Sequence, residues 1–245
     1  MNNVKKSYRK GGFTFKQFFV GHDRCAMKVG TDGVLLGAWA PVQQAKTALD
    51  IGSGSGLIAL MLAQRNQQVI IDAVELDSAA AQQAQENFIE SQWRERLQVF
   101  AQDIVEFCTQ RQHDYDLIVS NPPYFEPSVS CSSEQREQAR YTATLTHQTL
   151  LDSARHCLAP DGLFCLVLPY DVGEKVEAMA HSDNWFTAYR VNIRDKATMP
   201  FHRMLLGLKR EPVVAQITTL VLKEADNTIY TEDFQRLIRD FYLKY

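Results

Sequence analysis

Short apolar strands alternate with helical patterns along this 245-residue chain from residue 47 onward. Runs of β-branched and apolar residues predict buried strands, and apolar residues spaced three and four apart predict helices between them. This alternation is typical of an α/β fold, in which helices cross over between parallel strands. The predicted strands span residues 47–51, 69–74, 97–101, 115–119, 163–168, 188–193, 204–208 and 217–222.

Helix starts and stops follow from residue types that satisfy backbone groups at helix ends. Helices are predicted over residues 57–64, from Ser78 as N-cap, from Asp171 as N-cap to about residue 181, and after Thr231 as N-cap. A further helix, with Leu150 on its apolar face, is predicted to end at residues 160–162, where Pro-Asp-Gly favours a turn.

Composition restricts the class of protein. Hydrophobic residues make up 45% and charged residues 22% of the chain, which is ordinary for a soluble globular protein. No apolar run approaches the roughly 20 residues of a membrane span, and the polar N-terminus lacks a secretory segment. The five cysteines are odd in number and scattered, which argues against a disulfide framework and a structural zinc site. We therefore expect a cytoplasmic monomer without a membrane segment or metal.

The chain is predicted to form one domain, residues 1–245. It comprises a basic and aromatic N-terminal segment (1–46), a catalytic core (47–210) and a C-terminal strand and helix (211–245). Residues 125–145 are polar without clear periodicity, and a loop of this length is often a functional lid.

Basic residues gather in two places, although the net charge is −3. Residues 1–28 carry seven basic side chains against one acid, and residues 190–210 carry six against one. Such clusters are often merely solvated faces, but together they can also form a phosphate-binding surface. The predicted RNA-binding residues are Lys5, Lys6, Arg9, Lys10, Arg24, Lys28, Arg194, Lys196 and Arg203.

A glycine-rich turn, Asp50-Ile51-Gly52-Ser53-Gly54-Ser55-Gly56, follows the first strand of the core. Its glycines permit a tight turn and close approach of a ligand to bare backbone at a helix N-terminus. Leu57 stands where a dinucleotide fingerprint has its third glycine, which disfavours a dinucleotide site.

Polar residues end the next three strands. Glu75 follows the glycine turn at about the interval at which an acid meets ribose hydroxyls, and Asp103 could accept from an adenine amino group. Asn121 ends the fourth strand. Each acid alone is more simply a helix cap or a surface charge. In series at the carboxyl edge of a parallel sheet, they predict one binding site.

The stretch Asn121-Pro122-Pro123-Tyr124 follows the buried strand 115–119. Two prolines stiffen the turn and remove two backbone donors. The Asn121 side-chain oxygen and the Pro122 carbonyl can then accept from an –NH2 group, while Tyr124 offers a face for a planar ring. The simplest interpretation is a turn that ends a strand. Beside a cofactor site, the stretch predicts chemistry on a planar amino group.

These motifs together resemble the class I S-adenosylmethionine-dependent methyltransferases over about residues 47–210. The resemblance implies a Rossmann-like, seven-stranded mixed sheet whose last strand is antiparallel, with helices on both faces. The segment Gly21 to Gly33 is similar to the N-terminal signature of bacterial tRNA (adenine-amino) methyltransferases that modify valine tRNA, and the likeness continues through residues 140–142 and 240–243.

The resemblance implies a function and a set of residues. S-adenosyl-L-methionine would be the cofactor, tRNA the partner, and adenine 37 in the anticodon loop the substrate. The amino nitrogen would attack the sulfonium methyl in line, without a histidine base or a metal. The implied catalytic residues are Asn121, Pro122, Pro123 and Tyr124. The implied cofactor-binding residues are Thr31, Asp32, Asp50, Gly52, Gly54, Gly56, Glu75, Leu76, Asp103, Ile104 and Asn121. Thr31 or Asp32 could instead cap the helix that follows them.

Three alternatives remain open from the sequence. A protein methyltransferase acting on a glutamine amide uses a similar tetrapeptide but has a longer helical N-terminal domain. A ribosomal RNA guanine methyltransferase usually has a second tandem domain. A non-catalytic RNA-binding module could use the same fold, although the intact glycines, Glu75 and Asn121 speak against it.

Overall fold

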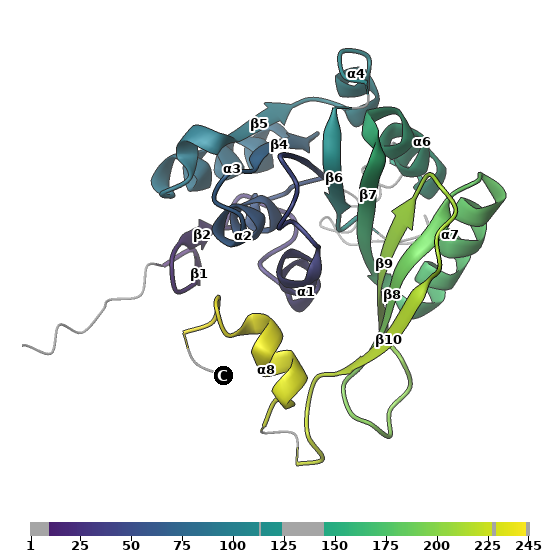
Figure 1. Ribbon diagram of the computed structural model, residues 1–245. Coiled ribbons are helices and arrows are strands. Elements are labelled where there is room, and N and C mark those ends of the chain that lie inside the picture. Colours follow the sequence, from purple (N-terminus) through teal and green to yellow (C-terminus); the bar gives the residue numbers. More distant parts are fainter. Residues whose placement is uncertain (1–9, 113, 124–144, 227–228, 244–245) are drawn as a thin grey trace, which may run out of the picture.

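The computed structural model describes residues 10–112, 114–123, 145–226 and 229–243. Eight strands form one sheet in the order β10-β8-β9-β7-β6-β3-β4-β5 (Figure 1). The strands of this sheet are β3 (Thr47–Ile51), β4 (Ile70–Glu75), β5 (Leu97–Ala101), β6 (Tyr115–Ser120), β7 (Leu158–Pro169), β8 (Phe186–Arg194), β9 (Arg203–Lys209) and β10 (Gln216–Val221). The helices are α1 (Thr31–Trp39), α2 (Leu57–Arg65), α3 (Ser78–Glu90), α4 (Ile104–Cys108), α6 (His147–Cys157), α7 (Tyr170–Ser182) and α8 (Glu232–Ile238), with a short 3₁₀ turn, η1 (Arg94–Arg96).

The central strands of the sheet are buried on both faces, as alternation of helices and strands predicts, whereas the edge strand β10 is mostly exposed. On β6, Leu117 and Val119 pack into one core, whereas Ile118 packs into the other. Helices α1, α2, α3 and α8 supply the first core, and α4, α6 and α7 supply the second. The predicted α/β fold with helices on both faces is therefore confirmed.

The predicted antiparallel strand is β9, which pairs antiparallel with both β7 and β8. The expected number of strands was wrong by one. Strand β10, predicted as a strand but placed outside the core, pairs in parallel with β8 from Gln216 to Val221 and makes an eighth strand. Its local pattern indicated a strand, but the identity of its partner depends on how the chain returns across the sheet.

The boundary between α6 and β7 also differs from expectation. The helix ends at Cys157 and β7 begins at once, so Pro160-Asp161-Gly162 lies within the strand. Leu158 pairs with Tyr115, and the register then shifts before Leu163 pairs with Leu117. This irregularity accommodates the turn-forming residues, because Pro160 and Asp161 are exposed.

Helix caps were predicted correctly at one position of four. Thr231 caps α8 by accepting from the Phe234 N–H at 3.3 Å. Asp77, not Ser78, caps α3, with its Oδ1 2.7 Å from the Ala80 nitrogen. Helix α7 begins after Pro169, and α1 after Gly30, and neither has a side-chain cap. Asp171 and the pair Thr31 and Asp32 therefore do not act as N-caps.

The N-terminal segment forms a small hairpin of β1 (Gly12–Thr14) and β2 (Phe19–Gly21), which sequence periodicity did not indicate. It lies near α3 in Figure 1. Phe15 and Phe18 stack with ring centroids 4.6 Å apart and join the core beneath α1 and α2. Within the described part of the chain, no helix is long and apolar enough to cross a membrane.

Candidate active site

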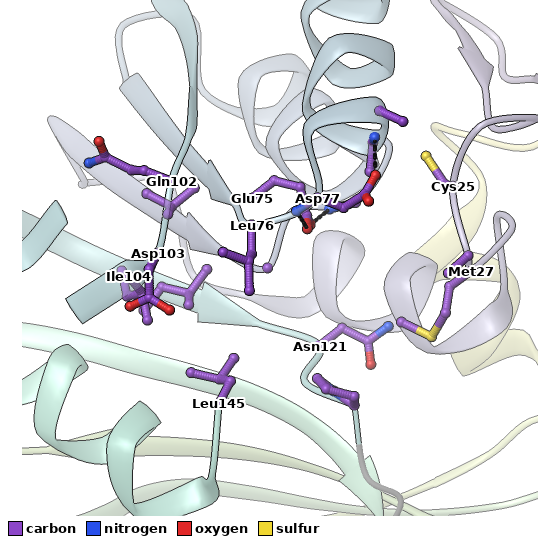
Figure 2. A pocket seen from close by; sticks show the side chains of 18 of the residues that line it. Cys25, Met27, Glu75, Leu76, Asp77, Gln102, Asp103, Ile104, Asn121 and Leu145 are labelled. Carbon is purple, nitrogen blue, oxygen red and sulfur yellow. Dashed lines mark hydrogen bonds between the residues drawn. The ribbon is translucent and has the colours of Figure 1, made fainter. Parts of the chain in front are cut away.

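A cavity of about 240 Å³ opens at the carboxyl ends of β3, β4, β5 and β6. This edge collects whatever side chains end each parallel strand, because neighbouring strands run in the same direction. Of the residues predicted to bind cofactor or to be catalytic, those lining the cavity are Gly52, Gly54, Glu75, Leu76, Asp103, Ile104, Asn121 and Pro123 (Figure 2).

The glycine turn leaves open space above its backbone. Gly52 and Gly54 have φ of +70° and +52°, and a Cβ built on either would meet no atom within 4 Å. Gly56 has a different role, because a Cβ there would lie 2.4 Å from the Phe88 ring. Gly52 and Gly54 therefore keep a ligand surface bare, whereas Gly56 allows the turn to pack against α3.

Asp50 lies beneath the turn rather than at the cavity, and its side chain is fully buried. Its Oδ2 accepts from the Ala59 N–H at 3.2 Å, whereas its Oδ1 has no hydrogen-bond partner in the described part of the chain. Burial raises the pKa of Asp50 to about 7. This carboxyl therefore supports the turn from below, at an energetic cost when it ionises.

Glu75 lines the cavity and is held by backbone N–H groups on both oxygens. Gly54 donates to its Oε2 at 2.8 Å, and Asp77 donates to its Oε1 at 2.9 Å. Burial raises the pKa of Glu75, and the two hydrogen bonds act against that shift. The carboxylate thus connects the glycine turn on β3 with the loop after β4.

Asp103 serves both local structure and the cavity. Its Oδ1 accepts from the Val105 N–H at 2.7 Å, which caps α4, and its side chain still lines the cavity. In Figure 2, Asp103 and Ile104 lie across the cavity from Asn121, with Leu145 below them. An acid cap and apolar side chains together suit a flat ring with a polar edge.

Asn121 directly follows β6, and the end of β6 is held to the neighbouring strand β3. The Ser120 hydroxyl donates to the Ile51 carbonyl at 2.8 Å, which ties the end of β6 to β3. The Asn121 Oδ1 is buried and has no hydrogen-bond partner among the described residues. Pro123 lines the cavity and Pro122 is buried. The predicted stacking residue, Tyr124, lies outside the described residues.

One wall of the cavity was not predicted to line it, although Arg24 in this wall was predicted to bind RNA. Arg24, Cys25, Ala26 and Met27 line it, and Figure 2 shows Met27 close to Asn121. These residues belong to the Gly21–Gly33 signature, which indicated a family but no contact. Burial raises the pKa of Cys25 to about 12, so its thiol stays protonated at neutral pH.

This wall is attached to α3 by a buried asparagine. Asn87 accepts from the Gly21 N–H and donates to the Gly21 carbonyl, each at 2.9 Å, and it also donates to the Ser55 carbonyl at 2.9 Å. Asn87 therefore joins the N-terminal hairpin to the glycine turn. Asn87 and Gln83 are both buried and polar on the helix face that otherwise carries alanines and Phe88, and this is the signal that could have indicated the role.

Thr31 and Asp32 do not line the cavity. Asp32 instead pairs with Arg203, whose Nε lies 2.9 Å from both carboxylate oxygens. The contact joins the start of α1 to the start of β9. A role for Thr31 and Asp32 in cofactor binding stays a prediction.

The predicted RNA-binding residues have diverse surroundings. Lys5, Lys6 and Arg9 lie outside the described residues, whereas Lys10 and Lys28 are exposed. Arg24 pairs with Glu86, Arg203 with Asp32, and Lys196 donates to the Ala225 carbonyl at 3.0 Å. Arg194 lies over the Phe201 ring, with its guanidinium carbon 5.3 Å from the ring centroid.

Known proteins resemble this chain in sequence and in fold. The family model of the methyltransferase small domain matches residues 27–182. A tRNA1(Val) (adenine(37)-N6)-methyltransferase of Serratia proteamaculans is 62% identical over 97% of this chain and 92% of its own length. A protein of the same name from Photorhabdus laumondii is 58% identical over 98% of this chain and 99% of its own length.

Solved structures with low sequence identity share the fold. A predicted O-methyltransferase from Agrobacterium tumefaciens superposes with a TM-score of 0.70 at 16% identity, covering 86% of this chain and 96% of its own. A TYW2 structure from Pyrococcus horikoshii, in complex with MeSAdo, gives 0.56 at 12% identity over 83% and 74%. With the matched family model and the close relatives, these findings place the chain in the methyltransferase small-domain family, among the tRNA1(Val) (adenine(37)-N6)-methyltransferases.

Proposed function

We propose that this protein methylates the exocyclic amino group of adenine 37 in tRNA1(Val), with S-adenosylmethionine as methyl donor. The names of its close relatives support the substrate, and the fold supports the reaction class. The observation that carries the proposal is the buried, unpartnered Asn121 Oδ1 at the edge of a cavity with a bare glycine turn.

The residues of the cavity fit S-adenosylmethionine. Gly52 and Gly54 offer open backbone, Glu75 offers carboxylate oxygens for ribose hydroxyls, and Asp103 offers an acceptor beside apolar side chains for adenine. When bound, S-adenosylmethionine supplies an activated methyl group on a sulfonium sulfur. We assign to Glu75 and Asp103 the binding of that donor, by its ribose hydroxyls and its adenine edge.

Asn121 would then activate the acceptor. Its Oδ1 can accept a hydrogen bond from the adenine amino group, and the Pro122 carbonyl can accept a second. These bonds favour a localised lone pair on the nitrogen and stabilise the positive charge that develops there. They also orient the nitrogen toward the donor, which lowers the entropic cost of the reaction. Tyr124 would hold the ring flat from its position after Pro123.

The target base must leave its stack to enter this cavity. An anticodon loop presents unpaired bases, so the cost of unstacking is lower than in a duplex. The exposed Lys10 and Lys28 would contact phosphates near the cavity wall formed by residues 24–27.

The experiment is to incubate the purified protein with labelled S-adenosylmethionine and a tRNA1(Val) transcript, then digest the RNA to nucleosides for mass spectrometry. We expect label in N6-methyladenosine, and loss of that label when adenine 37 is replaced by guanine. Label in another nucleoside, or label that persists in the replaced transcript, would contradict the proposal.

A further inference from the structure

Two stacked aromatic rings with an arginine at each end lie at the edge of the sheet that carries Asn121. Tyr170 stacks with Phe201 at a centroid distance of 5.3 Å and an interplanar angle of 28°. The Arg190 guanidinium lies 5.5 Å from the Tyr170 centroid, and the Arg194 guanidinium lies 5.3 Å from the Phe201 centroid. We call these four residues the arginine–aromatic row.

The position of the row follows from the topology. Tyr170 comes directly after β7, Arg194 ends β8, and Phe201 lies just before β9, so all three lie at the carboxyl edge of the parallel strands. Strand β7 runs three residues past Leu166, the partner of Ser120. At about 3.3 Å per residue, it rises about 10 Å above the end of β6. The row therefore lies at the same edge of the sheet as the cavity, over the strands on the other side of β6 from β3.

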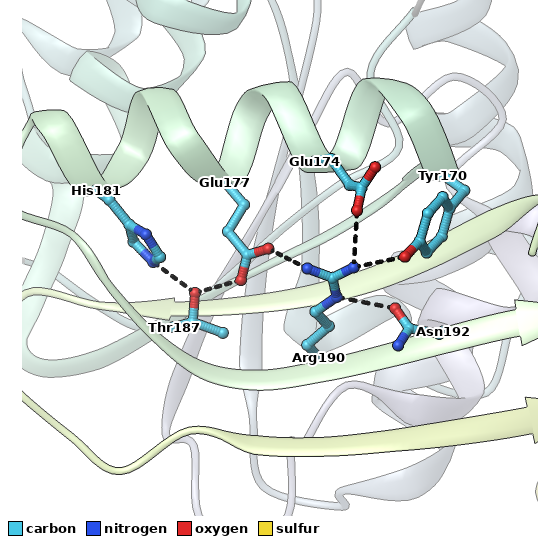
Figure 3. A network of polar contacts seen from close by, with 7 residues as sticks. All are labelled: Tyr170, Glu174, Glu177, His181, Thr187, Arg190 and Asn192. Carbon is cyan, nitrogen blue, oxygen red and sulfur yellow. Dashed lines mark hydrogen bonds and ion pairs between the residues drawn. The ribbon is translucent and has the colours of Figure 1, made fainter.

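At one end of the row, acidic and amide side chains surround Arg190, as Figure 3 shows. Arg190 donates to Glu177 at 2.7 Å, to the Tyr170 hydroxyl at 2.8 Å and to Asn192 at 2.9 Å. Its charge is compensated by this network, in which Glu174 also takes part. Arg190 is thus a support for Tyr170 rather than a free cation.

The other end of the row is different. Arg194 has no ion pair in the described part of the chain, and its Nε is buried without a hydrogen-bond partner there. The contact with Phe201 orients the guanidinium but satisfies none of its N–H groups. A half-buried cation with unsatisfied donors on an aromatic support is suited to a phosphate and to a stacked base.

The loop that carries Phe201 is fixed in place. Arg203 pairs with Asp32 on α1 and donates to the His202 carbonyl at 2.8 Å. The same His202 carbonyl accepts from the Tyr170 N–H at 3.2 Å, and the His202 N–H donates to Ile193 at 2.9 Å. Because α1 follows the cavity wall of residues 24–27, the row and the cavity are joined by one short path of contacts.

We propose that Arg194, supported by Phe201, forms a second nucleotide-binding position, which takes an unpaired ribonucleotide next to the target adenine. This inference rests on the proposed function, since the row faces RNA only if the cavity accepts a base from RNA. The phosphate of that nucleotide pairs with the Arg194 guanidinium, and its base stacks on the Arg194–Phe201 end of the row. Binding of this neighbouring nucleotide would help to keep the target adenine out of its stack.

The test compares Arg194→Ala, Arg194→Lys and Phe201→Leu with wild type, in binding of an anticodon stem–loop at several salt concentrations. Arg194→Ala should weaken binding about five- to tenfold, as loss of a stacked base does, and should lower the salt slope by about one. Arg194→Lys should keep the wild-type salt slope but not the wild-type affinity. The lysine ammonium keeps the positive charge but lacks the planar guanidinium group on which a base can stack. Phe201→Leu should weaken binding at an unchanged slope.

The matched control is Arg94→Ala. Arg94 is exposed and pairs with Glu95 just before β5, at the opposite edge of the sheet, so its loss should leave RNA affinity and slope unchanged. Melting temperature and S-adenosylmethionine affinity report folding in every variant. If Arg194→Ala does not fold, Arg194→Lys and Phe201→Leu still separate charge from stacking.

A second measurement locates the nucleotide. A stem–loop that lacks the base of the flanking nucleotide should bind wild type as weakly as the intact stem–loop binds Phe201→Leu. Combining the altered stem–loop with Phe201→Leu should weaken binding no further. Wild-type affinity and slope in Arg194→Ala, or additive losses at every flanking position, would overturn the proposal. Failure of the wild type to methylate the tRNA1(Val) transcript would instead contradict the proposed function.

Discussion

The cofactor side and the substrate side of this active site are built differently. On the cofactor side, both oxygens of Glu75 accept backbone N–H groups, and Asp103 caps α4. The glycine turn itself also contains buried atoms without partners among the described residues, the Asp50 Oδ1 and the Ser53 Oγ, so the contrast concerns the side chains that face the cavity. On the substrate side, the Asn121 Oδ1 and the Arg194 Nε are buried without partners among the described residues. Buried polar groups are usually satisfied, so an unsatisfied one that belongs to a cavity-lining residue, as Asn121 is, is available to a ligand.

This difference indicates which half of the active site the protein preorganises without a ligand. The cofactor half has its shape fixed by internal hydrogen bonds, and we expect it to bind S-adenosylmethionine without RNA. The substrate half retains acceptors and donors that only a substrate would satisfy. Variants of the two halves should therefore separate cofactor affinity from turnover.

Asn121→Ala should lower the rate of methyl transfer by about a hundredfold or more, because it removes an acceptor used in the transition state. Affinity for S-adenosylmethionine should stay near wild type. Single-turnover methylation of a tRNA transcript, with calorimetric titration of the cofactor, measures both quantities. A loss of cofactor affinity as large as the loss of rate would show that Asn121 belongs to the cofactor half.

Glu75→Gln should weaken S-adenosylmethionine binding by about tenfold or more. A side-chain amide would place an –NH2 group against the N–H of either Gly54 or Asp77, so the turn loses one of its two fixing hydrogen bonds. The affinity for RNA should change little. The dissociation constants of both ligands, measured on the same preparation, check this division, and a selective loss of RNA affinity would contradict it.

Asn87→Ala should lower the free energy of unfolding by about 2 kcal/mol, because buried groups of Gly21 and Ser55 lose their partners. It should also weaken cofactor binding severalfold, because the wall of residues 24–27 loses one of its attachments to α3 and keeps those of Arg24. Chemical denaturation and cofactor titration give the two values. Ser182→Ala, on the exposed end of α7, serves as a control that should alter neither.

The buried carboxyl of Asp50 should make the stability of the protein depend on pH. Its folded pKa of about 7 lies above its ordinary value of 3.8, so the folded protein holds a proton that the unfolded chain has released. This carboxyl therefore lowers stability as pH rises from about 4 to about 7, and the loss is complete above that. Because one pKa unit corresponds to about 1.4 kcal/mol, Asp50→Asn should remove at least 1 kcal/mol of this decrease.

Urea midpoints of wild type and Asp50→Asn at pH 5 and pH 8 measure that difference. The other carboxyls titrate in both proteins and cancel. Parallel pH dependences would show that Asp50 is ionised in the folded protein throughout the range.

Local sequence was sufficient for the strands and for half of the site. The alternation of apolar runs predicted β3 through β9 within a few residues, apart from β7, whose first residues contain Pro160 and Gly162. Gly52, Gly54, Glu75, Asp103 and Asn121 were found because each lies at the end of a strand or within three residues after it. Parallel strands bring such positions to one edge without any information about distant contacts.

The features that sequence could not indicate depend on distant partners. Asp32 and Arg203 are 171 positions apart, and only the fold brings the start of α1 beside the start of β9. Arg194 was predicted to bind RNA from local charge alone, which does not distinguish it from Arg190 in its network of acids. The wall of residues 24–27 was missed for a related reason, because Asn87 on α3 positions it.

The most direct test of the two-sided site is a calorimetric titration of S-adenosylmethionine, without RNA, into wild type, Asn121→Ala and Glu75→Gln. We predict that wild type and Asn121→Ala bind with similar dissociation constants, whereas Glu75→Gln binds about tenfold or more weakly. Cofactor binding that requires RNA, or that fails in Asn121→Ala and survives in Glu75→Gln, would contradict the account.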